Sequence, residues 1–191
     1  MKNYDLRTII FVALCCDLGL FAKRVIAPFA NIITDTLHIP GGIGTSFSLM
    51  FLVIAAVWLP NRFCGTIMGA VQSGLALAFG MVGSMGALAP IGYIIPGLVI
   101  DLTLLASARL PFSLAERMVV ANGLAAPAAA FTANCIVFHL RGIPLVLYLC
   151  VAASSGILCG LLGTQVVRRL IHVIKIQPKY IEYKGAQSIH E

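Results

Sequence analysis

Residues 143–167 read IPLVLYLCVAASSGILCGLLGTQVV, a run of 25 positions without a charged side chain. The hydrocarbon core of a bilayer is about 30 Å thick, and an α-helix crosses it in about 20 residues at a rise of about 1.5 Å per residue. The run is therefore long enough and apolar enough to form a transmembrane helix. It is one of six such stretches, which together occupy most of the 191 residues and predict an integral membrane protein.

The first of the six stretches differs from the rest because it is interrupted. Residues 8–22 are largely apolar, Lys23 and Arg24 follow, and the apolar run resumes over residues 25–33 with Pro28 inside it. This pattern predicts one broken helix, or a helix followed by a re-entrant piece. The other spans are predicted at residues 44–59, 63–82, 87–108 and 118–140. The last four of the six have a comfortable length for a bilayer, whereas the first two are short, broken or tilted.

The composition leaves almost nothing outside the lipid. Hydrophobic residues make up 60% of the chain and charged residues 10%, whereas soluble domains have about 25% charged residues. The mean hydropathy is +0.98. We therefore expect an all-α integral membrane protein, with one six-helix transmembrane bundle over residues 1–175 and a polar cytoplasmic tail over residues 176–191. A functional site must then lie between the helices.

The 13 Lys and Arg residues predict the orientation of the bundle. If the N-terminus is cytoplasmic, the inner segments hold ten of them, namely Lys2, Arg7, Arg62, Arg109, Arg117, Arg168, Arg169, Lys175, Lys179 and Lys184. Only Lys23, Arg24 and Arg141 remain for the outer side or the membrane. Because cytoplasmic loops carry the excess of Lys and Arg, we expect a multi-pass protein of the cell membrane with both termini inside. The net charge of +6 then reflects topology and contact with membrane lipid or an acidic partner, not binding of nucleic acid.

The sequence offers no motif for catalysis or nucleotide binding. It contains no G-x-S-x-G turn, no H-E-x-x-H pair and no G-x-x-x-x-G-K-[ST] run. The six cysteines lie within or at the edges of the predicted spans and form no C-x-x-C pair, which is typical of buried thiols that act as small apolar residues. We therefore expect a protein that is not an enzyme and that uses no cofactor or metal.

Small residues mark the places where helices can approach closely. The motifs Gly65-x-x-x-Gly69 and Gly156-x-x-x-Gly160 each put a groove of minimal side chains on one helix face. In lipid such grooves let backbones pack together, because apolar burial alone does not drive helices to associate. Each groove either packs helices within the bundle or docks a partner membrane protein. Gly65, Gly69, Gly156 and Gly160 are the candidate docking residues.

The connection between the first two spans, residues 31–46, is the longest predicted outer segment. It brings Asn31, Asp35 and His38 together with a turn that begins at Pro40 and continues with two glycines. Glycines permit backbone conformations that other residues resist. The segment is therefore predicted to act as a gate over an outward-facing cavity, and the alternative is a plain solvated loop.

Polar side chains inside the spans point to a site, because each costs free energy in lipid unless it is paired or faces a cavity. Asn134 and Tyr93 lie towards the outer ends of their spans, as do Asn31 and Ser46. An outer cluster of this kind suits a small-molecule pocket, in which rings supply stacking area and amides fix orientation. For any single residue, a hydrogen bond between helices is the alternative.

The sequence does not decide whether the molecule bound at such a site, its cargo, is anionic or cationic. Lys23 and Arg24 either mark an anionic cargo or extend to the outer interface. A cationic cargo would instead need a carboxylate and aromatic faces, for which the candidates are Asp17, Asp35, Asp101, Phe47, Phe51 and Tyr93. The complete set of candidate substrate-binding residues is Lys23, Arg24, Asn31, Asp35, His38, Ser46, Phe47, Tyr93 and Asn134.

Six spans in 191 residues, a broken first helix, a Pro-Gly outer loop and a basic tail form a recognisable combination. The chain also contains the runs Phe29-Ala-Asn31, Pro40-Gly-Gly-Ile-Gly44 and Gly97-Leu-Val-Ile-Asp101. This architecture resembles the substrate-binding S component of an energy-coupling factor (ECF) transporter, and the three runs are similar to its thiamine and hydroxymethylpyrimidine branch. The similarity covers roughly residues 6–108.

The resemblance implies a function in vitamin uptake. An S component of an ECF-type ABC importer binds a vitamin or precursor from outside, closes its first outer loop over it and topples in the membrane to release it inward. Energy comes from a separate module of one transmembrane coupling protein and two ATPase subunits. The alternatives are a self-sufficient small-solute transporter or channel, and an intramembrane enzyme.

Two departures from the family narrow this expectation. The chain begins Met1-Lys-Asn-Tyr4, without the N-terminal histidine ligand of the metal-transporting branch, so we do not expect cobalt or nickel as cargo. The Ala-x-x-x-Ala coupling pattern of the family's first helix is also absent, since Ala13 is followed four residues later by Asp17. Docking of the coupling protein would then use other small residues.

Overall fold

The computed structural model describes residues 6–36, 43–58, 63–80, 86, 88–108, 110–136, 139 and 141–174. Within these ranges the chain forms six α-helices and no β-strand, which confirms the all-α fold class. The helices are α1 (Leu6–Thr36), α2 (Ile43–Trp58), α3 (Cys64–Ala78), α4 (Ala89–Ser107), α5 (Leu114–Ile136) and α6 (Ile143–Ile174).

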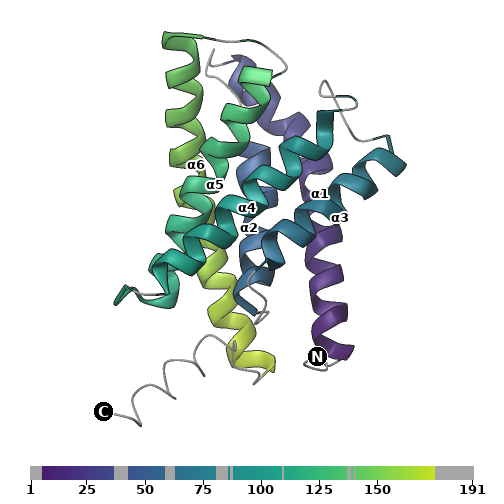
Figure 1. The fold of residues 1–191 in the computed structure, drawn as a ribbon, viewed down its shortest axis with the longest axis vertical. Helices are drawn as coiled ribbons and strands as arrows, with labels where there is room; N and C mark the ends of the chain where they lie inside the picture. Colours follow the sequence, from purple (N-terminus) through teal and green to yellow (C-terminus); the bar gives the residue numbers. More distant parts are fainter. Residues whose placement is uncertain are drawn as a thin grey trace.

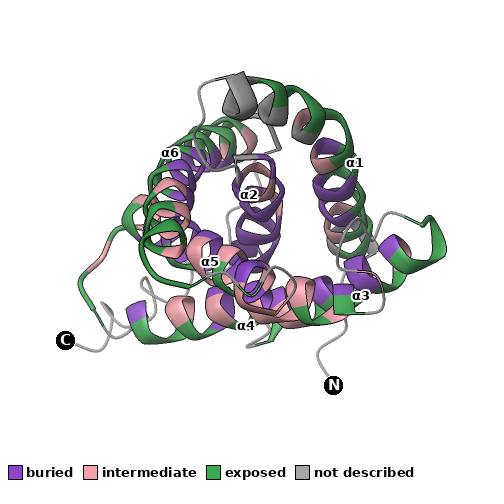
Figure 2. Ribbon diagram, turned by 90° about the horizontal axis from the view of Figure 1, so that it is seen from above, coloured by how far each residue is buried: buried purple, intermediate pink, exposed green. Residues whose placement is uncertain are grey.

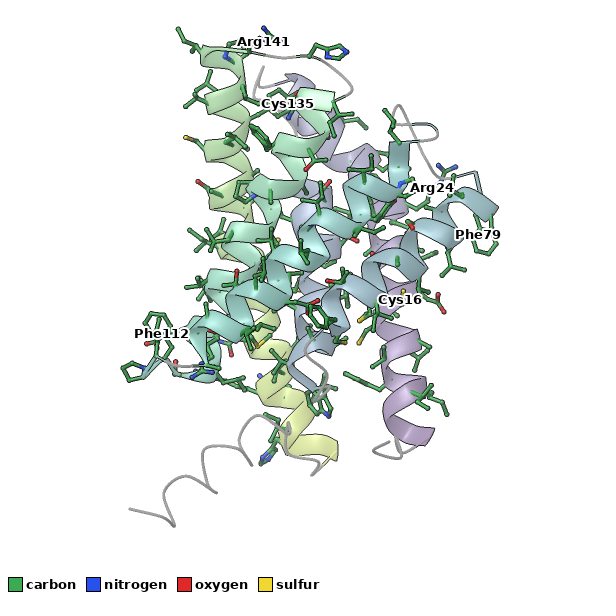
Figure 3. The ribbon with its side chains drawn as sticks, in the orientation of Figure 1. Cys16, Arg24, Phe79, Phe112, Cys135 and Arg141 are labelled. Atoms are coloured by element: carbon green, nitrogen blue, oxygen red, sulfur yellow. The ribbon has the colours of Figure 1, made fainter. Side chains whose placement is uncertain are left out.

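The helices run alternately up and down between two ends of the bundle (Figure 1). The start of α1 and the end of α6 lie at the same end, which we call the lower end; α1 ends and α2 begins at the upper end. Arg141 and Cys135 mark the upper end in Figure 3, and Phe112 marks the lower end. The side of a membrane on which either end lies stays a prediction.

Helix α2 forms the centre of the bundle. It contacts each of the other five helices, and Figure 2 shows it enclosed by them. Its sequence has no charged residue and is apolar apart from Thr45, Ser46 and Ser48 near its start, with only 1% exposure for Leu52, Val53 and Ile54. A helix that is hydrophobic all round is one that other helices surround.

The first helix is not broken, contrary to the prediction. Helix α1 continues for 31 residues through Lys23, Arg24 and Pro28. A proline removes one backbone hydrogen bond and crowds the preceding turn, but the other bonds on both sides of Pro28 keep the helix continuous. The predicted outer loop over residues 31–46 is also too long, because α1 reaches Thr36 and α2 begins at Ile43.

Helix lengths differ in their fit to a bilayer. Three helices are long and apolar enough to cross a membrane, over Ala89–Ser107, Leu114–Ile136 and Ile143–His172. The apolar helices Gly44–Trp58 and Cys64–Ala78 are shorter. Helix α3 has 15 residues where a longer span was predicted, because Phe79 is followed by Gly80 at φ +64°, a left-handed conformation that ends helices. Helix α1 is long enough but carries Arg7, Asp17, Lys23, Arg24 and Asp35.

The turn between α4 and α5 is fixed by side chains at the lower end. Ser113 and Glu116 form a capping box: the backbone N–H of Ser113 donates to Glu116 Oε2 (2.8 Å) and that of Glu116 donates to Ser113 Oγ (3.3 Å). Arg117 is 2% exposed, and its guanidinium donates to the carbonyls of Phe112 (3.2 Å) and Leu110 (3.0 Å). These bonds hold the start of α5 against the end of α4.

The surface of the bundle is apolar and its interior holds polar side chains. Large hydrophobic side chains are exposed along α1, α3, α4, α5 and α6, and none of those described on α2 is. Buried polar residues include Ser46, Gln72, Asp101, Asn122 and Ser155. The interior is otherwise mainly apolar, as in a soluble protein. The combination of an apolar surface with buried polar groups that bond one helix to another is typical of helices that pack in lipid.

Candidate functional site

The strongest polar contact in the described structure joins α3 to α4. The carboxylate of Asp101 accepts three hydrogen bonds, from the backbone N–H groups of Gly65 (2.8 Å) and Thr66 (2.7 Å) and from Thr66 Oγ1 (2.7 Å). The N-cap residue of α3, Phe63, supplies no side-chain cap. Asp101 therefore caps α3 from a neighbouring helix, and both of its oxygens already have partners within the chain.

A second polar contact joins α2, α5 and α6. Asn122 Nδ2 donates to the carbonyl oxygens of Gly156 (2.8 Å) and Ser46 (3.3 Å). The hydroxyl oxygens of Ser46 and Ser155 lie 2.8 Å apart. Asn122 is 0% exposed, and its Oδ1 has no hydrogen-bond partner among the described residues. The predicted substrate residue Ser46 thus lies in a contact between helices.

Lys23 and Tyr93 form a third contact, between α1 and α4. Lys23 Nζ lies 3.3 Å from the Tyr93 hydroxyl and 4.3 Å from the centroid of its ring. Both residues are half-buried. No carboxylate among the described residues lies within ion-pair distance of Lys23, so its ammonium contacts an aromatic ring and a hydroxyl instead of an acid.

The adjacent cation, Arg24, behaves differently. Its side chain is exposed, and Figure 3 shows it on α1, nearer the upper end than Cys16. The sequence leaves open whether Lys23 and Arg24 line a site or extend to the interface. The structure separates them, because Lys23 packs on α4 and Arg24 extends outward.

The remaining candidate residues do not join the Lys23–Tyr93 pair through any described contact. Phe47 packs edge-on against Phe51 of the same helix, with ring centroids 5.7 Å apart. Asn134 is buried, and its Nδ2 donates to the Ala130 carbonyl of its own helix (2.8 Å). Asn31 and Asp35 lie on α1, but their side chains are outside the described residues. Residues 37–42 of the predicted 31–46 gate, which include His38, are outside them as well.

The four candidate docking glycines lie between helices of this chain. A Cβ at Gly65 would sit 2.8 Å from the Gly97 carbonyl oxygen, and one at Gly69 would sit 2.5 Å from that of Tyr93, so both face α4. A Cβ at Gly156 or Gly160 would meet the backbone of α5 at 2.8 Å. This placement matches packing within the bundle, and we therefore do not assign these glycines to a partner.

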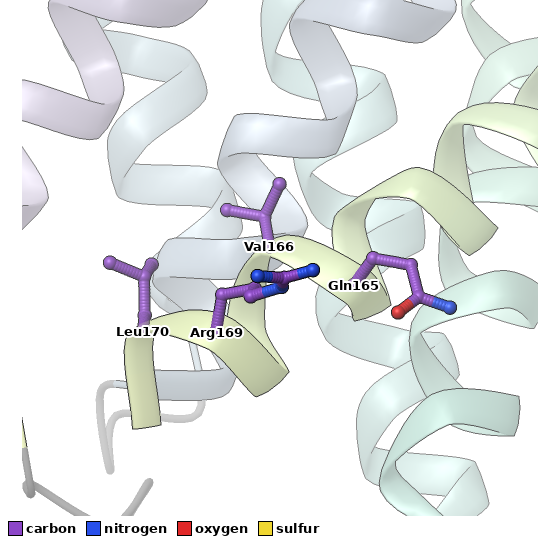
Figure 4. Close-up of a pocket in the computed structure, with 4 residues that line it drawn as sticks. All are labelled: Gln165, Val166, Arg169 and Leu170. Carbon is purple, nitrogen blue, oxygen red and sulfur yellow. The ribbon is translucent and has the colours of Figure 1, made fainter. Parts of the chain in front are cut away.

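A shallow cavity of about 360 Å³ lies on α6, towards the lower end of the bundle. Its described lining comes from this one helix and consists of Gln165, Val166, Arg169 and Leu170 (Figure 4). It is on the opposite half of the bundle from the predicted outer pocket. No candidate substrate residue lines it.

Several residues of these contacts are not among the candidates predicted from the sequence, and Ser155 and Cys16 are two of them. Ser155 pairs with Ser46, and the backbone carbonyl of Cys16 accepts a hydrogen bond from Gln72 Nε2 (3.0 Å), which joins α3 to α1. For the Ser155 contact, the sequence offers one indication, the run of small residues Ser154-Ser155-Gly156, since small residues accompany close helix contacts.

Comparison of the chain with protein-family models, with curated proteins and with solved structures finds no match. Among the described residues, no group of three or more His, Cys, Asp or Glu side chains gathers as metal ligands would. The proposal for function therefore rests on the sequence pattern and on the contacts above.

Proposed function

We propose that this chain is the membrane-embedded substrate-binding subunit of an ECF-type importer. It captures a small vitamin or vitamin precursor, of the thiamine-related group, from outside the cell. The supporting features are a helical chain with an apolar surface, three helices long enough to cross a membrane, and no nucleotide-binding motif. Energy then comes from a separate module of one transmembrane coupling protein and two ATPase subunits.

The observation that carries the binding role is the half-buried Lys23–Tyr93 pair. An ammonium group has three N–H donors, and one of those of Lys23 is directed to the Tyr93 hydroxyl. The remaining donors of Lys23 and the Tyr93 ring suit a flat heterocycle that offers a hydrogen-bond acceptor. Pockets for small ligands typically combine such a stacking surface with a few polar groups.

The same pair favours a neutral or anionic cargo over a cationic one. A positively charged ring about 5 Å from the ammonium would meet a repulsion of about 3 kcal/mol at an effective dielectric constant of about 20. Asp101, one of the acids proposed for a cationic cargo, is engaged with the start of α3. Within the thiamine-related group, the neutral hydroxymethylpyrimidine therefore suits this contact better than the thiamine cation.

Ligand binding by the purified chain tests the proposal. Mass spectrometry of the denatured extract identifies a co-purified vitamin, and calorimetry compares hydroxymethylpyrimidine with thiamine. If neither ligand binds with a Kd below about 1 mM, which corresponds to a binding free energy of about −4 kcal/mol, the vitamin assignment is contradicted. Solute movement into liposomes without ATPases would support a self-sufficient carrier, and turnover of a substrate would support an enzyme.

Variants at Lys23 locate the binding site. Lys23→Met removes the ammonium that faces Tyr93 and should weaken binding about tenfold, the loss expected for one hydrogen bond to a charged group. Arg24→Met removes the adjacent charge from an exposed side chain and is the matched control. Equal losses in the two variants would exclude the Lys23–Tyr93 pair as the site.

A further inference from the structure

The outward side of α1 carries an acid among apolar side chains. At about 100° per residue, four exposed residues fall within about 60° of one another around the helix, namely Ile10, Leu14, Asp17 and Phe21. We call these four residues the Asp17 face. The opposite side of the helix, which includes the buried Gly19, packs against α2 and α3. Figure 2 shows α1 at the edge of the bundle, with its outer side exposed.

Asp17 lies deep within the length of α1. At a rise of about 1.5 Å per residue, its Cα is about 16 Å from that of Leu6 and about 28 Å from that of Thr36. Figure 3 shows its neighbour Cys16 between the two ends of the bundle. Arg24 is also exposed, but it lies about 10 Å nearer the upper end and has a long side chain that extends towards the interface. The short carboxylate of Asp17 has no such reach.

The position of Asp17 has no explanation within the described part of the chain. No group in the described ranges forms a hydrogen bond or an ion pair with its carboxylate. Ionisable side chains inside a membrane are costly, and almost all of them face the bundle interior, line a water-filled cavity or pair with another group. Asp17 faces away from the bundle interior, and the cavity described above lies on α6. A group from another molecule must therefore complete its contacts.

A second copy of this chain does not suit the Asp17 face. Two copies related by a two-fold axis along the membrane normal bring equal heights together, so Asp17 would meet Asp17. The two carboxylates would repel one another, and Arg24 lies about 10 Å too high on the helix to compensate. A cation of a different protein, at the depth of Asp17, removes this cost.

We propose that the Asp17 face binds a transmembrane helix of another protein, one that carries a Lys or Arg side chain among apolar ones. The carboxylate of Asp17 accepts charge-assisted hydrogen bonds from that cation, and the three apolar side chains of the face pack against the apolar residues around it. The inference goes beyond the proposed function and rests only on its placement of α1 in a membrane. It is independent of the vitamin site, since the Lys23–Tyr93 pair takes no part.

Synthetic transmembrane peptides test this inference with the full chain in phosphatidylcholine liposomes. Each peptide is a helix of about 23 Leu and Ala residues with Lys, Glu or Leu at its centre, so that the central residue reaches the depth of Asp17 in either orientation. Energy transfer between a dye on the peptide and a dye on the C-terminus of the chain measures association. We expect the Lys peptide to bind about tenfold more tightly than the Leu peptide, and the Glu peptide to bind no more tightly than the Leu peptide.

Variants of the chain locate the contact. Asp17→Asn should remove most of the preference for the Lys peptide, because the amide carries no charge. Asp17→Lys should transfer the preference to the Glu peptide. Arg24→Gln changes the other exposed charge in this part of α1 and is the matched control, so it should change the preference for the Lys peptide by less than about twofold.

Three outcomes would overturn the inference. Equal binding of the three peptides shows that the Asp17 face requires no cation. A preference for the Lys peptide that persists in Asp17→Lys indicates attraction by another part of the chain. Self-association of the chain that Asp17→Asn abolishes assigns the face to a second copy. In each case, calorimetry with hydroxymethylpyrimidine on the same preparation shows separately whether the proposed function stands.

Discussion

The Asp101 cap makes a quantitative prediction about stability. Replacing Asp101 with Ala removes the acceptors of three hydrogen bonds of 2.7–2.8 Å and leaves the first backbone N–H groups of α3 without a partner. Hydrogen bonds to a charged group contribute about 1.5–3 kcal/mol each, but removing a buried carboxylate also relieves its desolvation cost. We therefore assign about 1 kcal/mol to each bond and expect a total loss of about 3 kcal/mol.

The corresponding change in Tm is measurable. A chain of this size loses about 2–4 °C per kcal/mol, so Asp101→Ala should unfold about 6–12 °C below the wild type. A thiol-reactive fluorescent dye reports the transition in detergent, because Cys15, Cys16, Cys64 and Cys159 are buried and become reactive on unfolding. Cys64 immediately precedes Gly65, so local opening at the start of α3 would appear as early labelling.

Graded variants distinguish a cap from a ligand contact. Thr66→Val removes one of the three bonds, and Asp101→Asn keeps one acceptor oxygen, so both should fall between the wild type and Asp101→Ala. Asp17→Asn, at an exposed acid of α1, is the control and should change Tm by no more than about 2 °C. Retention of the wild-type Tm by Asp101→Asn, together with loss of ligand affinity, would refute the capping argument.

Three further predictions concern the helix contacts, each measured as thermal stability in detergent. Gly69→Ala should lower the free energy of unfolding by about 1–3 kcal/mol, because its Cβ meets the Tyr93 carbonyl oxygen. Gly74→Ala, on the same helix, has open space around its Cβ and should raise the free energy of unfolding by about 0.5–1 kcal/mol. Equal changes in Tm for the two variants would contradict this. Asn122→Ala should lower the free energy of unfolding by about 1 kcal/mol, since two hydrogen bonds are lost and those between membrane helices average about 0.6 kcal/mol. An unchanged Tm would show that Asn122 does not stabilise the contact between these helices. Ser113→Ala should lower the free energy of unfolding by about 0.5–2 kcal/mol through loss of the N-cap bond, and an unchanged Tm would show that this bond does not hold the start of α5.

The lengths of the apolar runs predicted most helices well, and the errors have local causes. The fourth span was expected over residues 87–108 and α4 occupies Ala89–Ser107. Helix α6 extends beyond its apolar run, through Arg168 and Arg169, because arginine continues a helix as readily as leucine does. The expected break at Lys23 and Arg24 is absent because hydropathy reports charge and polarity, whereas a helix ends only when its backbone bonds are lost.

The polar contacts were predictable only in part. Gln72, Asp101 and Asn122 are recognisable in the sequence as costly residues inside apolar spans. The groups to which they bond could not be recognised, because most of these are backbone groups. They are the carbonyls of Cys16 and Gly156 and the N–H groups at the start of α3. Every residue carries such groups, so no residue type marks them. Only the three-dimensional packing shows which ones are used.

The central position of α2 has a consequence for how the protein is made. This helix is synthesised second, yet α5 and α6, which cover part of its surface, are synthesised last. Until those two helices are made, Ser46 has neither the Asn122 nor the Ser155 contact, and one side of α2 is not yet covered by its own chain. In detergent, the thiol of Ser46→Cys should accordingly react faster with a small maleimide in a chain that ends before α5 than in the complete chain, where α5 and α6 cover it. Insertion of the last two helices, more than of the first four, then completes the centre of the molecule.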